Sequence, residues 1–368
     1  MQIGYDAKRY FHNRSGLGNY SRDLVRIMRS YYPSHDYLLY TPKAPSSPFS
    51  EDLTIRYPER GFLNRLLPSY WRSKGIVRDL ESDAIDIFHG LSGEIPIGLQ
   101  RTRIKSVVSM HDLIFLRLPE LYKAMDRTIY AKKFRYAAQH ADKIVAISQQ
   151  TKQDLIHFFH IADEKIDVIY QGCHPAFKEE VTSAALANIR QKYDLPTAYI
   201  LNVGSIEPRK NAFQIVKAIE KLDIPLVIVG KETAYSNQIK HYIAEKKLEN
   251  RVLFRKVDSM EDLAVLYKLA SIFVYPSSYE GFGIPIIEAL YSGTPVITSN
   301  NGVFPEAAGP FSYFVDPEQV DHIRYAIESV LSSTDMQQEM KKNGLVYAQQ
   351  FNDEVLAKEW MNIYEQLA

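Results

Sequence analysis

The sequence predicts an α/β protein with two domains, each built around a mainly parallel β-sheet. Three observations support this class. At 368 residues, the chain exceeds the size at which one hydrophobic core usually stops growing. Short apolar, β-branched runs alternate with stretches whose apolar residues recur every three or four positions, which is typical of strands joined by helices. This alternation begins again after Pro196.

The first series of elements predicts the N-terminal domain. Its apolar runs read as strands, and the amphipathic stretches between them read as helices packed on a sheet. The predicted strands cover residues 2–6, 37–40, 85–89, 104–110, 143–147 and 165–170, and the predicted helices cover 20–31, 125–140 and 149–159.

The second series predicts another domain of the same kind. Its strands are expected over 198–203, 225–229, 251–255, 272–275, 295–298 and 313–315, with helices such as 212–222 and 260–269. The boundary lies near 172–182, which gives domains over 1–175 and 176–350. The remaining segment, 351–368, holds an amphipathic stretch with no strand after it, and we expect this helix to pack back on the N-terminal domain.

Composition restricts the partners and the compartment. The 44 basic and 44 acidic residues balance, which argues against nucleic acid as a partner. Cys173 is the only cysteine, so an intrachain disulfide and a zinc site built on cysteines are excluded and a reducing compartment is favoured. The first residues lack the apolar core of a signal peptide, and no run of eighteen apolar residues occurs. We therefore expect a cytoplasmic protein, at most peripheral at the inner face of the membrane.

One basic, aromatic segment, residues 56–78, suggests where such peripheral contact would occur. It could touch an anionic membrane surface or a lipid-linked acceptor, and a solvated helix face is the simpler alternative. The segment interleaves six cations with apolar and aromatic residues: Arg56, Arg60, Arg65, Arg72, Lys74 and Arg78 with Phe62, Leu63, Leu66, Leu67, Tyr70 and Trp71.

The strongest local pattern follows the strand predicted over 272–275. The chain there reads Ser-Ser-Tyr-Glu-Gly-Phe-Gly-Ile-Pro-Ile-Ile-Glu, residues 277–288. The two glycines let backbone amides approach a ligand closely, and Pro285 suits the first turn of the following helix. The amides of Gly281, Phe282, Gly283 and Ile284 would then favour an anionic oxygen of that ligand.

Two carboxylates accompany these amides. Glu280 lies just before the helix, where it can accept hydrogen bonds from sugar hydroxyls, and Glu288 lies further in, on the side that faces the ligand. There a carboxylate can accept both hydroxyls of a ribose. An ordinary helix cap with a surface glutamate is the alternative for either residue alone, and the combined spacing favours the ligand site.

A second pattern, Asn-Val-Gly-Ser-Ile-Glu-Pro-Arg-Lys-Asn over 202–211, follows the strand predicted over 198–203. Behind Gly204, the adjacent Arg209 and Lys210 can hold a diphosphate, the arginine through its planar fork and the lysine as a point charge. A surface pair of cations is the alternative. Because the chain has no Asp-x-Asp triplet, we expect these two cations to act in place of a metal ion.

Two weaker patterns lie in the N-terminal domain. Gly16 and Gly18 open the first long helix, where glycine-rich turns can bind phosphate, although Ser21 stands where a dinucleotide fingerprint has its third glycine. His111 and Asp112 follow the strand predicted over 104–110. A single histidine is more often structural than catalytic, and Asp112 reads as an orienting residue.

The pattern from Glu280 to Glu288, together with the following 289–297, resembles the family 4 glycosyltransferases, retaining enzymes with the GT-B fold. The resemblance extends over nearly the whole chain and implies two Rossmann-like domains facing across a cleft, the N-terminal one for the acceptor and the C-terminal one for the donor. It implies that Arg209 and Lys210 neutralise the leaving diphosphate, that Gly16 and Gly18 face the donor phosphates and the acceptor, and that His111 reaches the transferred sugar.

The function expected from this resemblance is transfer of a hexose from a nucleotide diphosphate sugar to a hydroxyl of a glycan or lipid-linked acceptor, in the synthesis of a bacterial surface polysaccharide. The reaction should retain stereochemistry and need no metal or bound cofactor. A mannosyl donor on GDP is favoured, with UDP-glucose or another hexose next. The alternatives are a non-catalytic subunit that binds a nucleotide sugar, and a sugar-nucleotide epimerase on the same architecture.

Overall fold

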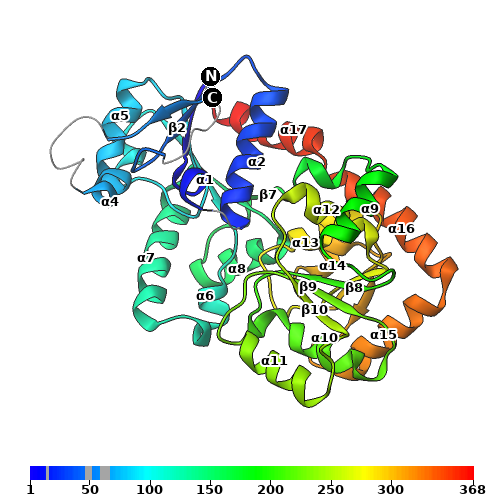
Figure 1. Ribbon diagram of the computed structural model, residues 1–368. Helices are drawn as coiled ribbons and strands as arrows, with labels where there is room; N and C mark the ends of the chain where they lie inside the picture. Colours follow the sequence, from blue (N-terminus) through cyan, green and yellow to red (C-terminus); the bar gives the residue numbers. More distant parts are fainter. Residues whose placement is uncertain (14–15, 46–51, 59–66) are drawn as a thin grey trace. The chain divides into compact units, whose positions relative to one another are not determined.

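The computed structural model describes residues 1–13, 16–45, 52–58 and 67–368. The chain forms two compact units (Figure 1). The N-terminal unit comprises residues 1–172 and 352–368, and the C-terminal unit comprises residues 173–351. Each unit has one parallel sheet with helices, which confirms the predicted class of fold.

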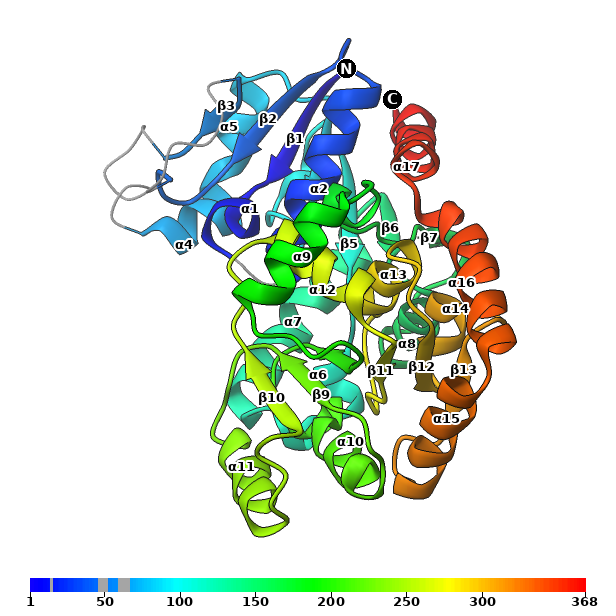
Figure 2. The same cartoon turned by 45° about the vertical axis from the view of Figure 1, so that its right-hand side comes forward.

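The sheet of the N-terminal unit has seven strands within the described residues, in the order β3-β2-β1-β4-β5-β6-β7, all parallel (Figure 2). Between β1 and β4 the strand order reverses, which is the point where open parallel sheets usually hold their ligands. The strands are β1 (Gln2–Asp6), β2 (Asp36–Tyr40), β3 (Thr54–Arg56), β4 (Ile87–Gly90), β5 (Lys105–Met110), β6 (Lys143–Ala146) and β7 (Ile166–Val168).

Helices cover both faces of this sheet, and the last helix of the chain is one of them. That helix packs against α2, where Arg26 pairs with Asp353 at 2.7 Å. A π-helical turn (Trp71–Gly75) joins α4 to α5. The helices are α1 (Lys8–His12), α2 (Gly16–Tyr31), α4 (Pro68–Tyr70), α5 (Ile76–Ser82), α6 (Ile114–Arg117), α7 (Ala124–His140), α8 (Gln149–Phe159) and α17 (Asp353–Leu367).

The C-terminal unit has six strands within the described residues, in the order β10-β9-β8-β11-β12-β13, again all parallel. The order reverses between β8 and β11. The strands are β8 (Ile200–Val203), β9 (Leu226–Val229), β10 (Val252–Arg255), β11 (Ile272–Tyr275), β12 (Val296–Ser299) and β13 (Tyr313–Val315). The helices are α9 (Ser183–Lys192), α10 (Ala212–Ala218), α11 (Ser236–Glu245), α12 (Met260–Leu269), α13 (Ile284–Tyr291), α14 (Phe304–Ala308), α15 (Val320–Ser332) and α16 (Thr334–Ala348).

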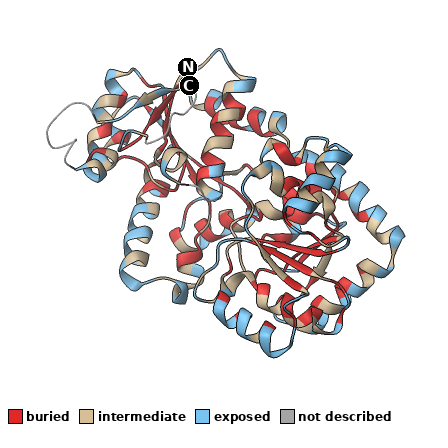
Figure 3. Ribbon diagram, viewed as in Figure 1, coloured by how far each residue is buried: buried red, intermediate tan, exposed pale blue. Residues whose placement is uncertain are grey.

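The strands form because their apolar residues are buried on both faces of each sheet (Figure 3). All four residues of β8, β9, β11 and β12 are buried, which explains why these strands read as short continuous apolar runs in the sequence. The edge strand β3 lacks this signal, because its residues are exposed or only partly buried. The sequence therefore does not predict this strand.

The basic segment 56–78 combines exposed and buried residues, with Leu67 52% and Tyr70 47% exposed. Residues 59–66 of this segment lie outside the described residues. Of the rest, Trp71 is buried and donates a hydrogen bond to Asp79 at 2.6 Å, and the Arg72 side chain, 11% exposed, turns inward to Asp6. These two residues are therefore part of the unit's interior rather than a solvated face. None of the described helices is long and apolar enough to span a bilayer.

Candidate active site

In the C-terminal unit, the loops that follow the neighbouring strands β8 and β11 meet at the reversal of strand order. The backbone amide of Ser278, after β11, donates to the carbonyl of Arg209, after β8, at 2.8 Å. The side chain of Asn211 donates to the Ser278 hydroxyl at 3.0 Å. These bonds hold the two loops that carry the predicted donor-binding residues in one place.

Arg209, Lys210 and Glu280 form one charged cluster at this point. The Arg209 guanidinium lies 2.8 Å from one carboxylate oxygen of Glu280, and the Lys210 ammonium lies 3.3 Å from the other. All three side chains are at most 16% exposed. The structure thus brings together three residues that are up to 71 positions apart in the sequence, counted from Arg209 to Glu280.

Tyr275, which the sequence analysis did not single out, completes the cluster. Its hydroxyl donates to Glu280 at 2.8 Å and accepts from the Lys210 ammonium at 3.1 Å. Because Tyr275 is the last residue of β11 and is buried, its hydroxyl is fixed between the lysine and the glutamate. One signal was available in the sequence, since a buried tyrosine at a strand end needs a polar partner for its hydroxyl.

The pKa values in this cluster favour the charged forms. Burial opposes the charge on Glu280, but Lys210 and Arg209 outweigh it and lower the pKa of that carboxyl. Burial likewise opposes the charge on Lys210, but Tyr275 and Glu280 outweigh it and raise the pKa of the ammonium. Within these three residues, two cations and one anion leave one positive charge, which can attract a diphosphate. A second carboxylate, the 43% exposed Glu207, lies 3.7 Å from Arg209.

The predicted anion-binding amides lie at the start of α13. Gly283 precedes this helix with a φ of 122°, a backbone conformation that residues other than glycine rarely adopt. The helix begins at Ile284, so the backbone of Gly281 to Ile284 leads into its N-terminus beside Glu280. Gly204 follows β8 and lies next to the Lys210 side chain.

Glu288 lies on α13 apart from the charged cluster. It is buried, and the hydroxyl of Tyr267 donates to its carboxylate at 2.9 Å. Burial raises the pKa of this carboxyl to about 7, although Tyr267 and Lys210 oppose the rise. At neutral pH, Glu288 is therefore close to its own titration midpoint in the absence of a ligand.

The raised pKa of Glu288 predicts a loss of stability as the pH rises. The folded protein holds this proton more tightly than the unfolded chain, so the free energy of unfolding should fall by about 3 kcal/mol between roughly pH 4.5 and pH 8. Glu288→Gln keeps the acceptor for Tyr267 and removes the titration. Denaturant unfolding at pH 5 and pH 8 without nucleotide should show the variant gaining stability relative to wild type at the higher pH, and an equal pH dependence of both proteins would contradict this origin.

In the N-terminal unit, His111 follows β5 and is held in one orientation. Its Nε2 lies 2.8 Å from the carbonyl of Leu91, which can only accept, so Nε2 carries the proton. Burial lowers the pKa of His111 to about 4, which leaves the ring neutral and Nδ1 free to accept from the amide of Gln171 at 3.1 Å. The ring of Tyr20 packs edge-on at 4.5 Å. Both ring nitrogens are thus occupied, and His111 is fixed as a neutral group rather than a proton donor.

The side-chain amide of Gln171 holds the ring of His111 by donating to its Nδ1. Gln171→Leu should leave the buried Nδ1 of His111 without its donor, and we expect the free energy of unfolding to fall by about 1–3 kcal/mol. Gln171→Asn is the conservative control. Denaturant unfolding measures the loss, and ¹⁵N NMR of His111 reports the tautomer. An unchanged stability and an unchanged tautomer in Gln171→Leu would show that the amide does not hold the ring.

The two glycines of the N-terminal pattern lie within the first turn of α2. A side chain on Gly18 would meet the carbonyl oxygen of Asn13 at 1.9 Å, so this glycine allows close packing of the preceding segment, whereas Gly16 has open space around it. Ser148 and Asp112 both accept hydrogen bonds from nearby backbone amides. Ser148 caps α8 by accepting from the amide of Thr151, and Asp112 accepts from the amide of Ile114 at 3.1 Å. Across the described residues, no three His, Cys, Asp or Glu side chains are grouped so that they could hold a metal ion.

A parallel two-unit fold with this charged cluster defines a glycosyltransferase of the GT-B class, and comparison with known proteins gives the family. Residues 14–177 match the family model described as Glycosyltransferase Family 4, and residues 187–346 match the one described as Glycosyl transferases group 1. The chain belongs to the family 4 glycosyltransferases.

Among curated proteins, the chain is 29% identical to the O-antigen chain mannosyltransferase B of Escherichia coli, over 76% of this chain and 74% of that protein. It is 27% identical to the O-antigen chain mannosyltransferase RfbU of Salmonella typhimurium, over 61% of this chain and 60% of the relative. It is also 28% identical to the serotype-specific mannosyltransferase WbdA of Escherichia coli, but it spans only 34% of that longer protein.

Solved structures share the fold at lower identity. Sucrose-phosphate synthase from Thermosynechococcus elongatus superposes with a TM-score of 0.79 at 22% identity, covering 100% of this chain and 99% of that one. Anabaena Alr3699/HepE, solved in complex with UDP-glucose, gives a TM-score of 0.78 at 16% identity with 100% coverage of both chains.

Proposed function

We propose that this enzyme transfers a mannosyl residue from GDP-mannose to a hydroxyl of a growing bacterial surface polysaccharide, with retention of configuration and without a metal ion. The cluster of Arg209, Lys210 and Glu280 is the observation that carries the proposal, because it supplies the cationic charge that a leaving diphosphate needs. The choice of mannose and of polysaccharide is supported by the O-antigen mannosyltransferases that the chain resembles.

In the proposed reaction, the acceptor oxygen attacks the anomeric carbon on the face from which the diphosphate departs. The bond from that carbon to the phosphate oxygen breaks, and the acceptor's proton passes to the departing oxygen. Arg209 and Lys210 stabilise the charge that develops there, with the amides of 282–284 beside them. Every part of this charge stabilisation comes from groups already fixed in the C-terminal unit.

Glu280 is assigned to orient the transferred sugar rather than to attack it. Both of its oxygens are already engaged, one by Arg209 and the other by Tyr275 and Lys210. A carboxylate held by three partners is a poor nucleophile, which supports a single displacement over the double displacement of retaining glycosidases. Glu288 would accept the ribose hydroxyls of the nucleotide, and neutral His111 would contact the sugar through its fixed ring or carbonyl.

A panel of donors tests the proposal. Purified enzyme is incubated with GDP-mannose, GDP-fucose, UDP-glucose and UDP-galactose in EDTA, and hydrolysis is followed by ¹H NMR, which also shows the anomer first released. UDP donors belong in the panel because HepE was solved with UDP-glucose. The proposal predicts that GDP-mannose is consumed fastest and releases the α-anomer, the configuration of the donor. Turnover only with an added divalent metal, or release of the β-anomer, would refute it.

A further inference from the structure

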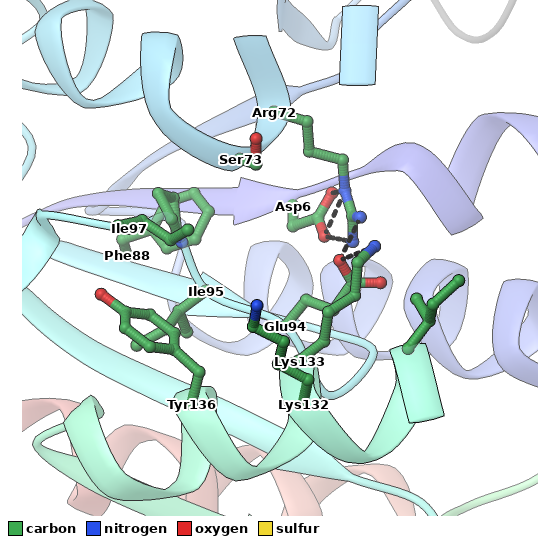
Figure 4. Close-up of a pocket in the computed structure, with 12 residues that line it drawn as sticks. Asp6, Arg72, Ser73, Phe88, Glu94, Ile95, Ile97, Lys132, Lys133 and Tyr136 are labelled. Carbon is green, nitrogen blue, oxygen red and sulfur yellow. Dashed lines mark hydrogen bonds and ion pairs between the residues drawn. The ribbon is translucent and has the colours of Figure 1, made fainter. Parts of the chain in front are cut away.

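The N-terminal unit holds a cavity of about 300 Å³ that none of the assigned residues explains. It lies between α7, the π-helical turn and the loop that follows β4, and its lining is mostly apolar. Figure 4 shows Phe88, Ile95 and Ile97 gathered beside Tyr136, with the Asp6–Arg72 pair across the cavity. A cavity of this size and polarity suits several methylene or isoprene carbons rather than a sugar.

Helix α7 contributes to this cavity through a second face, which mixes apolar and basic side chains. One side of the helix, including Phe134, Ala137 and Ala138, packs into the hydrophobic core of the unit. Another side lines the cavity with Ile129, Lys132, Lys133 and Tyr136, which follow one another at three- and four-residue spacing. Ile129 is 46% exposed, so this face of the helix is open to an incoming ligand.

The rim of the cavity is positively charged. Arg72 lies 2.5 Å from Asp6 and 2.7 Å from Glu94, and Lys133 lies 3.0 Å from the same Glu94. With Lys132, the lining has three cations and two carboxylates, which leaves one positive charge. The Lys132 ammonium has no ion pair or hydrogen bond with any described residue, so it is available to an anion.

Lys8 adds a further cation near this rim. Burial and the charge of Arg72 lower the pKa of Lys8, and Glu94 and Asp6 offset this only in part. An anionic group bound at the rim would relieve the repulsion between these cations. The apolar lining and the cationic rim of the cavity therefore fit an amphiphile that has an apolar chain and an anionic head group.

The cavity is linked to His111 by the loop after β4. The carbonyl of Leu91 in this loop accepts from His111, and Glu94 and Ile95, three and four residues later, line the cavity. The amide of Gly93 between them bonds to the carbonyl of Ser109 on β5 at 2.9 Å. The same loop therefore both lines the cavity and fixes the orientation of His111.

We propose that this cavity binds the first carbons of the lipid anchor of a lipid-phosphate-linked acceptor, and that Lys132 and its neighbours hold the adjoining phosphate. The inference rests on the proposed function and on the expectation that the N-terminal unit serves the acceptor. It narrows that acceptor to one whose glycan is attached to a lipid through phosphate. The π-helical turn that presents Arg72 to Asp6 agrees with a binding role, because such turns occur frequently at functional sites.

Binding of monomeric alkyl phosphates tests the cavity without any need for turnover. Decyl phosphate, kept below its micelle concentration, should bind wild type at least tenfold more tightly than butyl phosphate, since each buried methylene contributes about fourfold. Ile129→Trp fills the open side of the cavity and should lower decyl phosphate affinity at least tenfold. Met125→Trp, one turn away on the same helix, 73% exposed and outside the lining, is the matched control. Lys132→Ala should weaken both alkyl phosphates, and Lys123→Ala neither.

Turnover then separates this inference from the proposed function. Decyl phosphate should inhibit transfer to a lipid-linked acceptor in wild type but not in Ile129→Trp, and it should leave donor hydrolysis unchanged in both. Absence of any donor hydrolysis would refute the proposed function and leave the binding test intact. The inference is overturned if wild type binds both alkyl phosphates equally. Binding to anionic phospholipid vesicles is measured alongside, and if Ile129→Trp weakens only that binding, this face of α7 is a membrane contact and the inference is likewise overturned.

Discussion

Arg209→Ala is expected to lower kcat/KM for the sugar donor by about a thousandfold. Removing one fixed group that stabilises developing charge costs about 10²–10³ in rate, and this arginine also contributes to donor binding in the ground state. The remaining Lys210 has a single point charge and cannot reproduce the planar fork of the guanidinium. Arg209→Lys should recover part of the rate for the same reason.

The measurement is initial-rate kinetics of donor turnover, with donor concentration varied through KM. Lys256→Ala, which removes an exposed cation from the same unit, serves as the matched control and should leave the rates unchanged. Arg209→Ala also takes away one of the charges that lower the pKa of Glu280, so the residual activity should shift toward higher pH. A loss in Arg209→Ala of less than tenfold would mean that the guanidinium does not hold the leaving group.

Glu280→Gln is expected to separate binding from chemistry. The substitution raises the charge of the cluster from +1 to +2, so affinity for a free nucleoside diphosphate should be kept or increased. Transfer should nevertheless fall by about 10²–10³, because the sugar loses the carboxylate that orients it. The two variants therefore differ in one respect, since Arg209→Ala weakens both binding and turnover, whereas Glu280→Gln weakens turnover alone.

The same substitution should destabilise the empty enzyme. Arg209 and Lys210 are nearly buried, and breaking a buried ion pair by removing one partner costs about 3–5 kcal/mol. A bound diphosphate replaces the missing negative charge and should restore most of this stability. Denaturant unfolding of Glu280→Gln with and without nucleoside diphosphate measures both effects. Equal stabilisation of wild type and variant by the diphosphate would show that Glu280 does not balance the two cations.

The elements that the sequence predicted well are those in which local pattern and burial agree. Strand β11 and helix α8 were predicted with the same bounds as in the structure, because both faces of the strand are buried and Ser148 caps the helix. The short edge strand β3 had no apolar pattern to reveal it. The inward direction of Arg72 depended on Asp6, which lies 66 residues earlier in the chain.

In the candidate site too, contacts between residues far apart in the sequence were not predictable from local patterns. Residues in one contiguous pattern, such as Glu280 and Gly283, stand out because a strand end, a glycine turn and a helix start follow one another. Tyr275 and Gln171 did not stand out, since their partners Lys210 and His111 lie 65 and 60 residues away. Local spacing predicts which loops carry the site, whereas the pairing of side chains between loops depends on the strand order of the sheet.

The most direct test of the central claim is a calorimetric titration of GDP and GDP-mannose into the enzyme in EDTA, with Arg209→Ala and Glu280→Gln in parallel. Our account predicts binding without any divalent metal, at least tenfold weaker binding in Arg209→Ala, and undiminished binding of GDP in Glu280→Gln. Binding that appears only when magnesium or manganese is added, or that is the same in Arg209→Ala as in wild type, would contradict the role of this cluster as the diphosphate site.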